Sequence, residues 1–271
     1  MTPGMTIVTA VVPTKNSGRT IAACLESLRR QTQPGVQIVV VDNASTDDTV
    51  ELARSRADVV IHGGPERSAQ RNHGWLSTAD PYVVFVDSDM VLEPDVLRHA
   101  VDQLASAPAM GGVVIPEHAF GVGFFPRCRA LEKALYLGDE RVEALRVVRR
   151  EVLHEVGGFD ESLTAFEDWE LHDRITHAGY GIGRTAAAIW HDEGRITLGT
   201  LFAKKRYYGR WLPTAHASGK LSRPLARRFF VKRPALLFRT PHRTAGLALL
   251  KTVELAGIVF GAADARRQRA S

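Results

Sequence analysis

The sequence predicts an α/β fold in which a mostly parallel β-sheet is flanked by helices. Short apolar strands alternate with helical segments along the first part of the chain. These apolar runs are nearly continuous, which is typical of strands that are covered on both faces. Polar residues stand where three of the strands end, and ligands of such sheets bind beyond the carboxyl ends of the strands. These strand ends therefore form the candidate site.

The first elements follow from apolar periodicity and from the residues that separate the segments. The first helix has Ile21, Leu25 and Leu28 on one face. The second opens on Thr and Asp residues, which suit a helix N-terminus. The expected helices cover residues 18–32, 46–57 and 68–79, and the expected strands cover residues 6–14, 36–45, 58–63 and 82–86.

The middle of the chain is less regular. A helix at residues 167–180 has an acidic first turn, and residues 144–163 are expected to form a strand, a short helix and a glycine turn. The remaining expected elements are a strand at residues 111–119, a helix at 127–140 and a strand leading into a polar loop at 181–194.

The composition is that of an ordinary globular protein. The 271 residues are 45% hydrophobic and 24% charged, which allows one large domain with an appendage or two small domains. The two cysteines, Cys24 and Cys128, imply no disulfide framework and suit a reducing cytoplasm. The first residues lack a basic leader, so we expect no signal peptide.

Charge is distributed unevenly along the chain. Residues 1–200 carry 19 Lys and Arg against 28 Asp and Glu, a net charge of −9, whereas residues 201–271 carry 16 against 2, a net charge of +14. We therefore expect a catalytic domain at residues 1–199 and a basic, aromatic, helical extension at residues 200–271. A basic extension suits an anionic partner, either nucleic acid or an anionic membrane surface.

The extension contains a mostly apolar stretch of 19 residues at 244–262, interrupted by Lys251 and Glu254. A membrane-spanning helix needs about 20 apolar residues with few charges, so we expect an interfacial or tightly packed helix rather than a span. Its apolar residues and the aromatic residues of a basic helix at 201–212 favour a membrane surface over nucleic acid.

The strand at Tyr82–Val86 ends in Asp87, Ser88 and Asp89. Two carboxylates one residue apart repel each other, so a cationic group should lie close by. An isolated motif of this kind is also common in solvated turns. Carboxylates are hard oxygen ligands that suit Mg²⁺ or Mn²⁺, and such a metal can neutralise a diphosphate leaving group.

A second acidic pair lies at Glu167 and Asp168, after a glycine turn at the start of the helix at 167–180. A carboxylate placed there can accept a proton from an attacking hydroxyl. The helix dipole should hold the pKa of Asp168 down unless burial opposes it.

Over roughly residues 7–195 the chain resembles a family 2 glycosyltransferase. The resemblance depends on six motifs in the order of that family, namely VVPTKNSGRTIAACLESLRRQT, VVDNASTDDT, AQRNHG, VDSD, GGFDESL and EDWEL. The resemblance implies the GT-A fold, which is a Rossmann-like sheet flanked by helices. It also implies transfer of one sugar, with inversion, from a nucleotide-diphosphate sugar to a hydroxyl acceptor.

The resemblance assigns the nucleotide to the strand ends. Asp42 would bind the base, Asp87 would bind the ribose, and Arg71 would position the base or the diphosphate. Asp42 could instead cap the following helix, and Arg71 could be a surface arginine. The implied nucleotide-binding set also includes Pro13, Thr14 and Ser88.

The resemblance also assigns the metal and the catalytic base. Asp89 would ligate Mn²⁺ or Mg²⁺, and His191 would complete the metal and diphosphate site. Asp168 would be the catalytic base, with Glu167 beside it near the acceptor. His191 could also be an ordinary loop histidine, and Asp168 could be no more than a helix N-terminal charge.

Departures from the family pattern refine the expected reaction. Asn43 follows Asp42 where many relatives carry a second acidic residue, and the Q-x-x-R-W motif of processive synthases is missing. We therefore expect transfer of a single sugar. UDP-sugars are favoured over GDP-mannose and dTDP-sugars because a carboxylate suits the N3–H of uracil. The basic extension favours a polyprenyl-linked or other glycan acceptor and a peripheral position on the cytoplasmic face of the membrane.

Three other classes of protein fit the same residues less well. A phosphatase of the haloacid dehalogenase type would carry its D-x-D motif on its first strand, whereas two or three β-α units precede it here. A nucleotidyltransferase would need a glycine-rich loop after the first strand, and PTKNSGRT has one glycine. A non-catalytic nucleotide-sugar or membrane-binding protein need not retain both Asp89 and Asp168.

Overall fold

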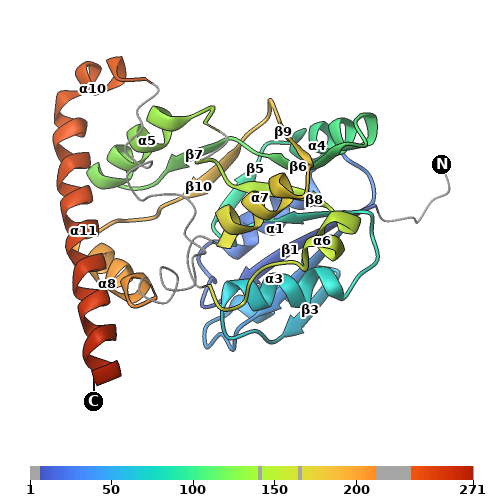
Figure 1. The fold of residues 1–271 in the computed structure, drawn as a ribbon, viewed down its shortest axis with the longest axis horizontal. Coiled ribbons are helices and arrows are strands. Elements are labelled where there is room, and N and C mark those ends of the chain that lie inside the picture. The colour runs from blue at the N-terminus through green and yellow to red at the C-terminus, as the bar shows by residue number, and fades with distance from the viewer. Residues whose placement is uncertain (1–6, 140–141, 164–166, 212–232, 271) are drawn as a thin grey trace. The chain divides into compact units, whose positions relative to one another are not determined.

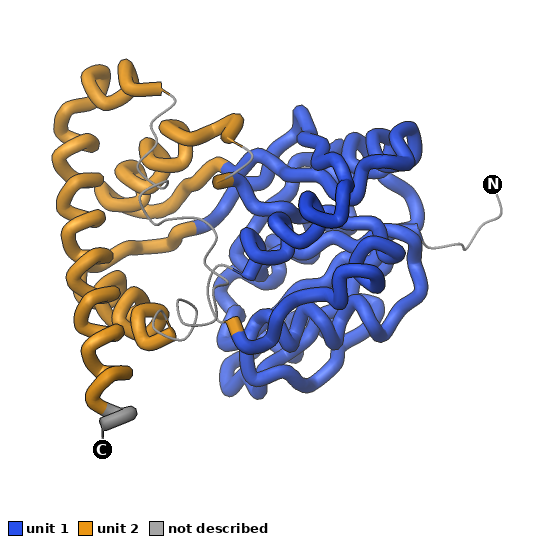
Figure 2. Tube along the Cα trace, viewed as in Figure 1, with its two compact units in different colours: residues 1–117, 143–162, 167–192 blue, residues 118–142, 163–166, 193–271 orange. Residues whose placement is uncertain are grey.

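The computed structural model describes residues 7–139, 142–163, 167–211 and 233–270. The chain forms two compact units (Figure 2). The first contains residues 1–117, 143–162 and 167–192, and the second contains residues 118–142, 163–166 and 193–271. Residues 118–142 thus group with the C-terminal helices, and the division at residue 199 stays a prediction.

The first unit is built on a seven-stranded sheet with strand order β3-β2-β1-β4-β8-β6-β9 (Figure 1). The first four of these neighbours are parallel, β8 is antiparallel to both of its neighbours, and β6 and β9 are parallel. The expected mostly parallel sheet is therefore confirmed, with β8 as the exception. In chain order the strands are β1 (Val8–Thr14), β2 (Val36–Asp42), β3 (Val59–His62), β4 (Tyr82–Phe85), β6 (Met110–Val114), β8 (Leu145–Arg149) and β9 (Gly181–Arg184).

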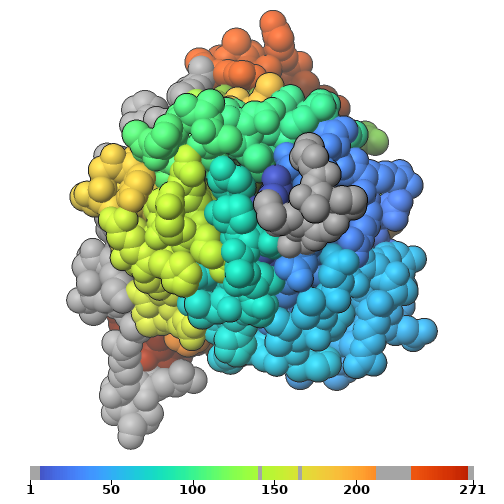
Figure 3. All heavy atoms as spheres, turned by 90° about the vertical axis from the view of Figure 1, so that its right-hand side faces the viewer, coloured from blue at the N-terminus to red at the C-terminus, as the bar shows by residue number. Residues whose placement is uncertain are grey.

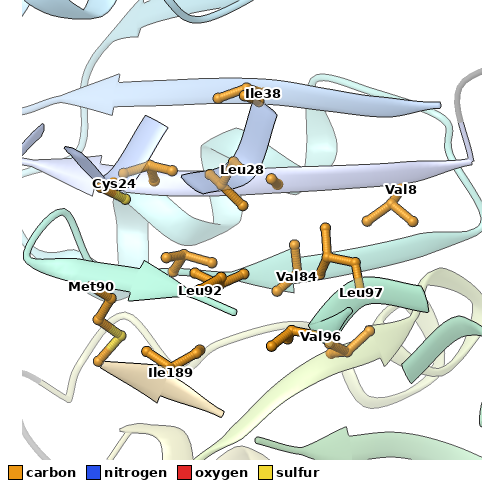
Figure 4. Packing of buried hydrophobic residues seen from close by; sticks show 14 of the residues in the cluster. Val8, Cys24, Leu28, Ile38, Val84, Met90, Leu92, Val96, Leu97 and Ile189 are labelled. Carbon is orange, nitrogen blue, oxygen red and sulfur yellow. The ribbon is translucent and has the colours of Figure 1, made fainter. Parts of the chain in front are cut away.

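Helices cover both faces of this sheet (Figure 1). One apolar cluster joins the strands to α1 (Ile21–Arg29) and α4 (Val96–Ser106). Figure 4 shows its centre, where Cys24 and Leu28 of α1 approach the strand residue Ile38. The other cluster joins the strands to α3 (Arg67–Leu76), α6 (Arg150–Val156) and α7 (Glu167–His177).

Neighbouring residues of β1 belong to opposite clusters, since Ala10 and Val12 pack with α1 whereas Val11 packs with α3. Burial on both faces explains why the strand sequences are apolar throughout. The close packing against α3 also requires a glycine, because a Cβ on Gly74 would lie 2.3 Å from Val11. Figure 3 shows that segments from different parts of the chain lie next to one another on the surface of the first unit.

Two segments expected as single strands are each divided. Residues 111–119 break at Pro116 into β6 and β7 (Glu117–Phe120), because proline cannot donate to a strand ladder. Residues 181–194 divide into β9 and β10 (Ile189–Asp192). A second sheet has the order β5-β10-β7, in which β5 (Met90–Leu92) directly follows Asp89 and pairs with β10 in antiparallel orientation.

The second unit is helical. Its main helices are α5 (Phe124–Tyr136), α8 (Leu198–Gly209) and α11 (Pro241–Ala270), and the short α10 (Ala235–Arg239) precedes α11. α11 packs against α5 and α8. The long α11 includes the apolar stretch at 244–262, and the residues between α8 and α10, 212–232, lie outside the described residues.

Glycine allows α8 and α11 to approach closely. A Cβ on Gly261 would lie 2.1 Å from the carbonyl oxygen of Arg206, and a Cβ on Gly209 would lie 2.4 Å from that of Ile258. Among the described residues, one helix, Pro241–Arg267, is long and apolar enough to cross a membrane by length and composition alone, with a mean hydropathy of 1.6 over its most apolar 18 residues. The same test is passed by core helices of soluble proteins.

Candidate active site

The carboxyl ends of β1 and β2 place Thr14 opposite Asp42. The Asp42 carboxylate is buried and accepts hydrogen bonds from Thr14 Oγ1 at 2.9 Å, Ser45 Oγ at 2.6 Å and the Ser45 backbone N–H at 2.9 Å. Asp42 therefore organises the loop after β2 rather than capping α2 (Thr49–Arg54), whose N-cap is Asp48. Pro13, also expected in the nucleotide set, is buried in β1 beside Thr14.

Gln70 ties α3 to the same strand ends and was not found by sequence reasoning. Its side-chain amide donates to the carbonyl oxygens of Thr14 at 2.9 Å and Val41 at 2.6 Å. The Thr14 carbonyl also accepts the Asn43 backbone N–H at 2.9 Å, so Gln70 and the loop after β2 both hold the end of β1. The only sequence signal was the position of Gln70 directly before Arg71, on the helix that follows β3.

Arg71 bridges two acidic residues that are far apart in the sequence. Its Nη2 donates to Asp87 Oδ1 at 2.8 Å, and its Nη1 donates to Glu167 Oε1 at 2.9 Å. The guanidinium lies over the ring of Phe159, 5.1 Å from its centroid. Arg71 is only 3% exposed, so it is not a surface arginine. Its buried Nε has no hydrogen-bond partner within the described part of the chain.

Arg146, on β8, is the second cation at Asp87 and was also missed from the sequence. Its Nη1 donates to Asp87 Oδ2 at 3.3 Å, while Nε and Nη2 both donate to Glu117 Oε1, at 3.1 and 2.5 Å. Burial opposes ionisation of Asp87, but Arg71 and Arg146 outweigh it and hold its pKa well below the ordinary value. The sequence predicted a cationic group near Asp87 and Asp89, and the structure has two, Arg71 and Arg146.

Asp89 and His191 come together through the pairing of β5 with β10. Asp89 Oδ2 lies 3.0 Å from His191 Nε2, and the Asp192 backbone N–H donates to the Asp89 carbonyl at 2.8 Å. Ser88 lies between the two acidic residues, and its hydroxyl is 2.8 Å from that of Ser17.

The Asp89–His191 pair fits a divalent cation as a partial ligand set. Within the described ranges, no group of three or more His, Cys, Asp or Glu side chains is placed to hold a metal. Mg²⁺ is commonly bound by one or two carboxylates together with substrate phosphates and waters, and Mn²⁺ accepts the same oxygen ligands. The protein could thus supply Asp89 and His191 while a diphosphate supplies further oxygens.

Asp168 lies in the first turn of α7, and one of its oxygens accepts the Trp169 backbone N–H at 2.9 Å. Burial raises the pKa of Asp168, and the neighbouring charge of Glu167 raises it further, against the opposing effect of Arg146 and Arg71. Burial therefore overrides the helix dipole, which by itself would lower this pKa. A raised pKa suits a carboxyl that must accept a proton.

Asn72 joins the arginine–asparagine motif to the glycine turn that precedes α7. Its Oδ1 accepts the Phe159 N–H at 2.9 Å, and its Nδ2 donates to the Phe159 carbonyl at 2.9 Å and to Glu161 at 2.9 Å. Gly158 has φ +68°, and a Cβ there would lie 2.7 Å from Asn72 Oδ1. The two motifs therefore occur together because the Asn72 side chain holds the glycine turn in place.

Residues 9–159 match the family model described as glycosyl transferase family 2. The chain belongs to glycosyl transferase family 2. The succinoglycan biosynthesis protein ExoA of Rhizobium meliloti is 29% identical over 222 residues, which is 74% of this chain and 67% of that relative. Across this and two further curated relatives, the match covers 46% to 67% of the relative's length.

Solved structures of glycosyltransferases share the fold. Mannosyltransferase PcManGT from Pyrobaculum calidifontis, in complex with GDP-Man and Mn²⁺, is 24% identical with a TM-score of 0.58, over 99% of this chain and 76% of that one. TarS from S. aureus, in complex with UDP, is 18% identical with a TM-score of 0.55, over 98% and 92%. These likenesses confirm the GT-A fold for this family 2 glycosyltransferase.

The buried position of Arg146 gives a prediction about stability. Arg146→Met leaves Glu117 and part of Asp87 buried without their cation, so the free energy of unfolding should fall by about 3 kcal/mol. Urea denaturation measures this change. The double variant with Glu117→Gln should lose less than the two single changes together, because the residues are coupled.

Arg30→Met provides the matched control. It removes an ion pair with Glu26 in which both side chains are largely exposed, so its effect should stay below about 1 kcal/mol. Equal losses for Arg30→Met and Arg146→Met would show that the Arg146 pairs contribute no more than a surface ion pair.

Proposed function

We propose that the protein transfers one sugar, with inversion, from a nucleotide-diphosphate sugar to a hydroxyl acceptor. The observation that carries this proposal is the bridge formed by Arg71 between Asp87, at a strand end, and Glu167, next to Asp168. It links a carboxylate held ionised to a carboxyl whose pKa is raised. Two acidic groups with opposed pKa shifts suit two different tasks in one reaction.

The donor would be bound by the strand-end residues. Asp87, ionised by its two arginines, can accept hydrogen bonds from ribose hydroxyls. Arg71 retains a buried Nε–H without a partner among the described residues, and this donor suits an oxygen of the nucleotide. Thr14, Pro13 and Ser88 would complete the contact surface for the base and ribose.

Asp168 would act as the catalytic base. In a single displacement with inversion, one carboxylate takes the proton from the acceptor hydroxyl while that oxygen attacks the anomeric carbon from the side opposite the diphosphate. Glu167 would raise the basicity of Asp168 through its charge while Arg71 holds Glu167 in place.

Asp89 and His191 would hold Mn²⁺ or Mg²⁺. Such an ion, when bound, neutralises the charge that develops on the diphosphate leaving group. The 3.0 Å separation of their ligating atoms supports a shared target for both side chains.

The donor nucleotide is proposed to be UDP. The Asp42 carboxylate has four lone-pair sites, and Thr14 and Ser45 occupy three of them. The remaining site, on Oδ2, which lies 3.9 Å from His62 Nδ1, could accept the N3–H of uracil or an N–H of guanine. The two solved structures contain GDP-Man and UDP, and therefore favour neither base.

The acceptor is proposed to be a lipid-linked glycan, such as a polyprenyl-phosphate-bound sugar, used in envelope or exopolysaccharide synthesis at the cytoplasmic face of a membrane. The basic C-terminal residues and the family relationship to ExoA, a succinoglycan biosynthesis protein, support this choice. A soluble acceptor is the alternative, favoured by the packing of α11 on α5 and α8.

Removal of the metal ligand should abolish the metal dependence of nucleotide binding. With Asp89→Ala, the affinity for UDP or GDP should be the same with Mn²⁺ and with EDTA, whereas wild type should bind more tightly with Mn²⁺. A thermal-shift titration measures this, because a ligand raises the melting temperature of the state that binds it. A screen of nucleotide sugars in the same assay identifies the donor. Wild-type affinity that is insensitive to EDTA would contradict the metal site.

Asp168→Asn keeps the shape of the side chain but removes its basicity. Turnover should fall by at least about 100-fold while donor affinity is retained. The variant should also melt at or above the wild-type temperature at neutral pH. Because the folded pKa of Asp168 is raised, its ionisation reduces stability once the pH exceeds the unfolded pKa. NMR of the product anomer tests the stereochemistry, and a retained configuration would refute the mechanism.

Glu167→Gln should change the pH dependence of turnover. Asp168 must be ionised to accept a proton, so the rate should rise with pH through its raised pKa. Removing the charge of Glu167 lowers that pKa, and the acid limb of the profile should move to lower pH. Glu170→Gln, on the same helix and paired with Arg174, is the control and should leave the limb in place. An unmoved limb in Glu167→Gln would exclude this coupling.

A further inference from the structure

The two charges that interrupt the apolar stretch of α11 turn toward the neighbouring helices. Lys251 Nζ lies 2.8 Å from Glu254 Oε2 and also pairs with Glu132 of α5. Glu254 Oε1 accepts from Arg129 Nη2 at 2.7 Å and pairs with Lys205 Nζ of α8 at 3.3 Å. Glu254 is buried, so this charge network belongs to the inside of the helical unit.

The remaining inward positions of α11 serve close packing. Gly246 lies against Phe124 and Cys128 of α5, and Gly257 and Gly261 lie against the backbone of α8. Asp264 pairs with Arg206 at 2.7 Å. Both acidic residues of the stretch 201–271, Glu254 and Asp264, are thus engaged with α5 or α8.

The outward side of α11 carries no charge over five turns. Its large exposed side chains recur at helical spacing, and Leu255 is 63% exposed. Smaller exposed residues fill the positions between them. Apolar surfaces of this kind on soluble units mark interaction sites. The outward residues are Ala245, Ala248, Leu249, Thr252, Leu255, Val259, Phe260 and Ala263.

Basic residues stand at both ends of this apolar face. Arg239 is exposed before the start of α11, beside Phe238, which is 83% exposed. Arg266 and Arg267 are exposed after its last apolar turn. This apolar strip is bounded by arginines and lies in a segment with a net charge of +14. It is complementary to a membrane surface, in which anionic headgroups cover apolar acyl chains.

We propose that this outward face of α11 docks into the interfacial layer of an anionic membrane, with the helix lying along the surface. A spanning orientation would place Arg129, Glu254 and Lys251 in hydrocarbon, which is costly for charged groups. A second copy of the chain suits this face less well, because pairing would bring together two segments that each carry a net charge of +14. Only the purpose of the docking, which is to bring a lipid-linked acceptor to the enzyme, rests on the proposed function.

Flotation of the full chain tests the docking. The vesicles contain 70% phosphatidylcholine and 30% phosphatidylglycerol, or phosphatidylcholine alone. Wild type should float with the anionic vesicles at low salt, and Leu255→Glu should reduce the partition coefficient at least about tenfold, through lost apolar burial and repulsion from the headgroups. Arg266→Gln with Arg267→Gln should reduce it by roughly fivefold per charge, and less at high salt.

Leu76→Glu is the matched control. Leu76 is 58% exposed, close to the value for Leu255, but it lies at the end of α3 in the other unit. It should float like wild type, and circular dichroism should show the same fold for both variants. An alkaline carbonate wash should release wild type from the vesicles, because the wash removes peripheral proteins and leaves membrane-spanning helices in place.

Several outcomes would overturn the docking. These are equal flotation of wild type with both vesicles, equal flotation of wild type and Leu255→Glu, or retention after the carbonate wash. Sedimentation equilibrium would overturn it in a different way if wild type were a dimer that Leu255→Glu dissociates, because the face would then bind a second copy. The Mn²⁺-dependent rise in melting temperature with UDP or GDP, measured without vesicles, reports on the donor site separately, so the two proposals can fail independently.

Discussion

The arrangement of the strand ends in the first unit depends on the carboxylate of Asp87. It stands at the end of a buried strand, two residues from a second carboxylate, and it cannot stay ionised there without cations. Arg71 comes from α3 and Arg146 from β8, so a helix and an antiparallel strand must both be in place. Each arginine then holds another acidic residue, Glu167 or Glu117, in the same network.

This constraint gives a physical reason for the exception in the sheet. β8 runs antiparallel between β4 and β6, with Arg149 opposite Tyr82 at the start of β4. The other end of β8 therefore lies toward the carboxyl end of β4, and Arg146 stands near that end. A parallel strand with the same register ends would place Arg146 near Tyr82, at the opposite end of β4 from Asp87. The antiparallel strand thus brings a cation to the edge of the sheet where the ligand should bind.

Motif spacing and apolar periodicity predicted the parallel strands and the residues at their ends, because these signals are local. The division of residues 111–119 was missed although Pro116 marks it, and Gln70 and Arg146 were missed because their partners lie far along the chain. The direction of the pKa shift of Asp168 could not be derived either, since burial is a tertiary property. Sequence reasoning therefore found the carboxylates of the site and Arg71, but not the ion pairs of Arg71 or the second cation, Arg146.

The same distinction between local and tertiary information applies to α11. In the sequence, Lys251 and Glu254 weaken an apolar stretch, whereas in the structure they face Arg129, Glu132 and Lys205. A helix that places its charges inward, in pairs, can leave its other side apolar without burying an uncompensated charge. Packing on α5 and docking to a membrane are therefore compatible, because they use opposite sides of one helix. Whether a charged residue opposes membrane contact depends on the side of the helix it occupies, and composition does not contain that information.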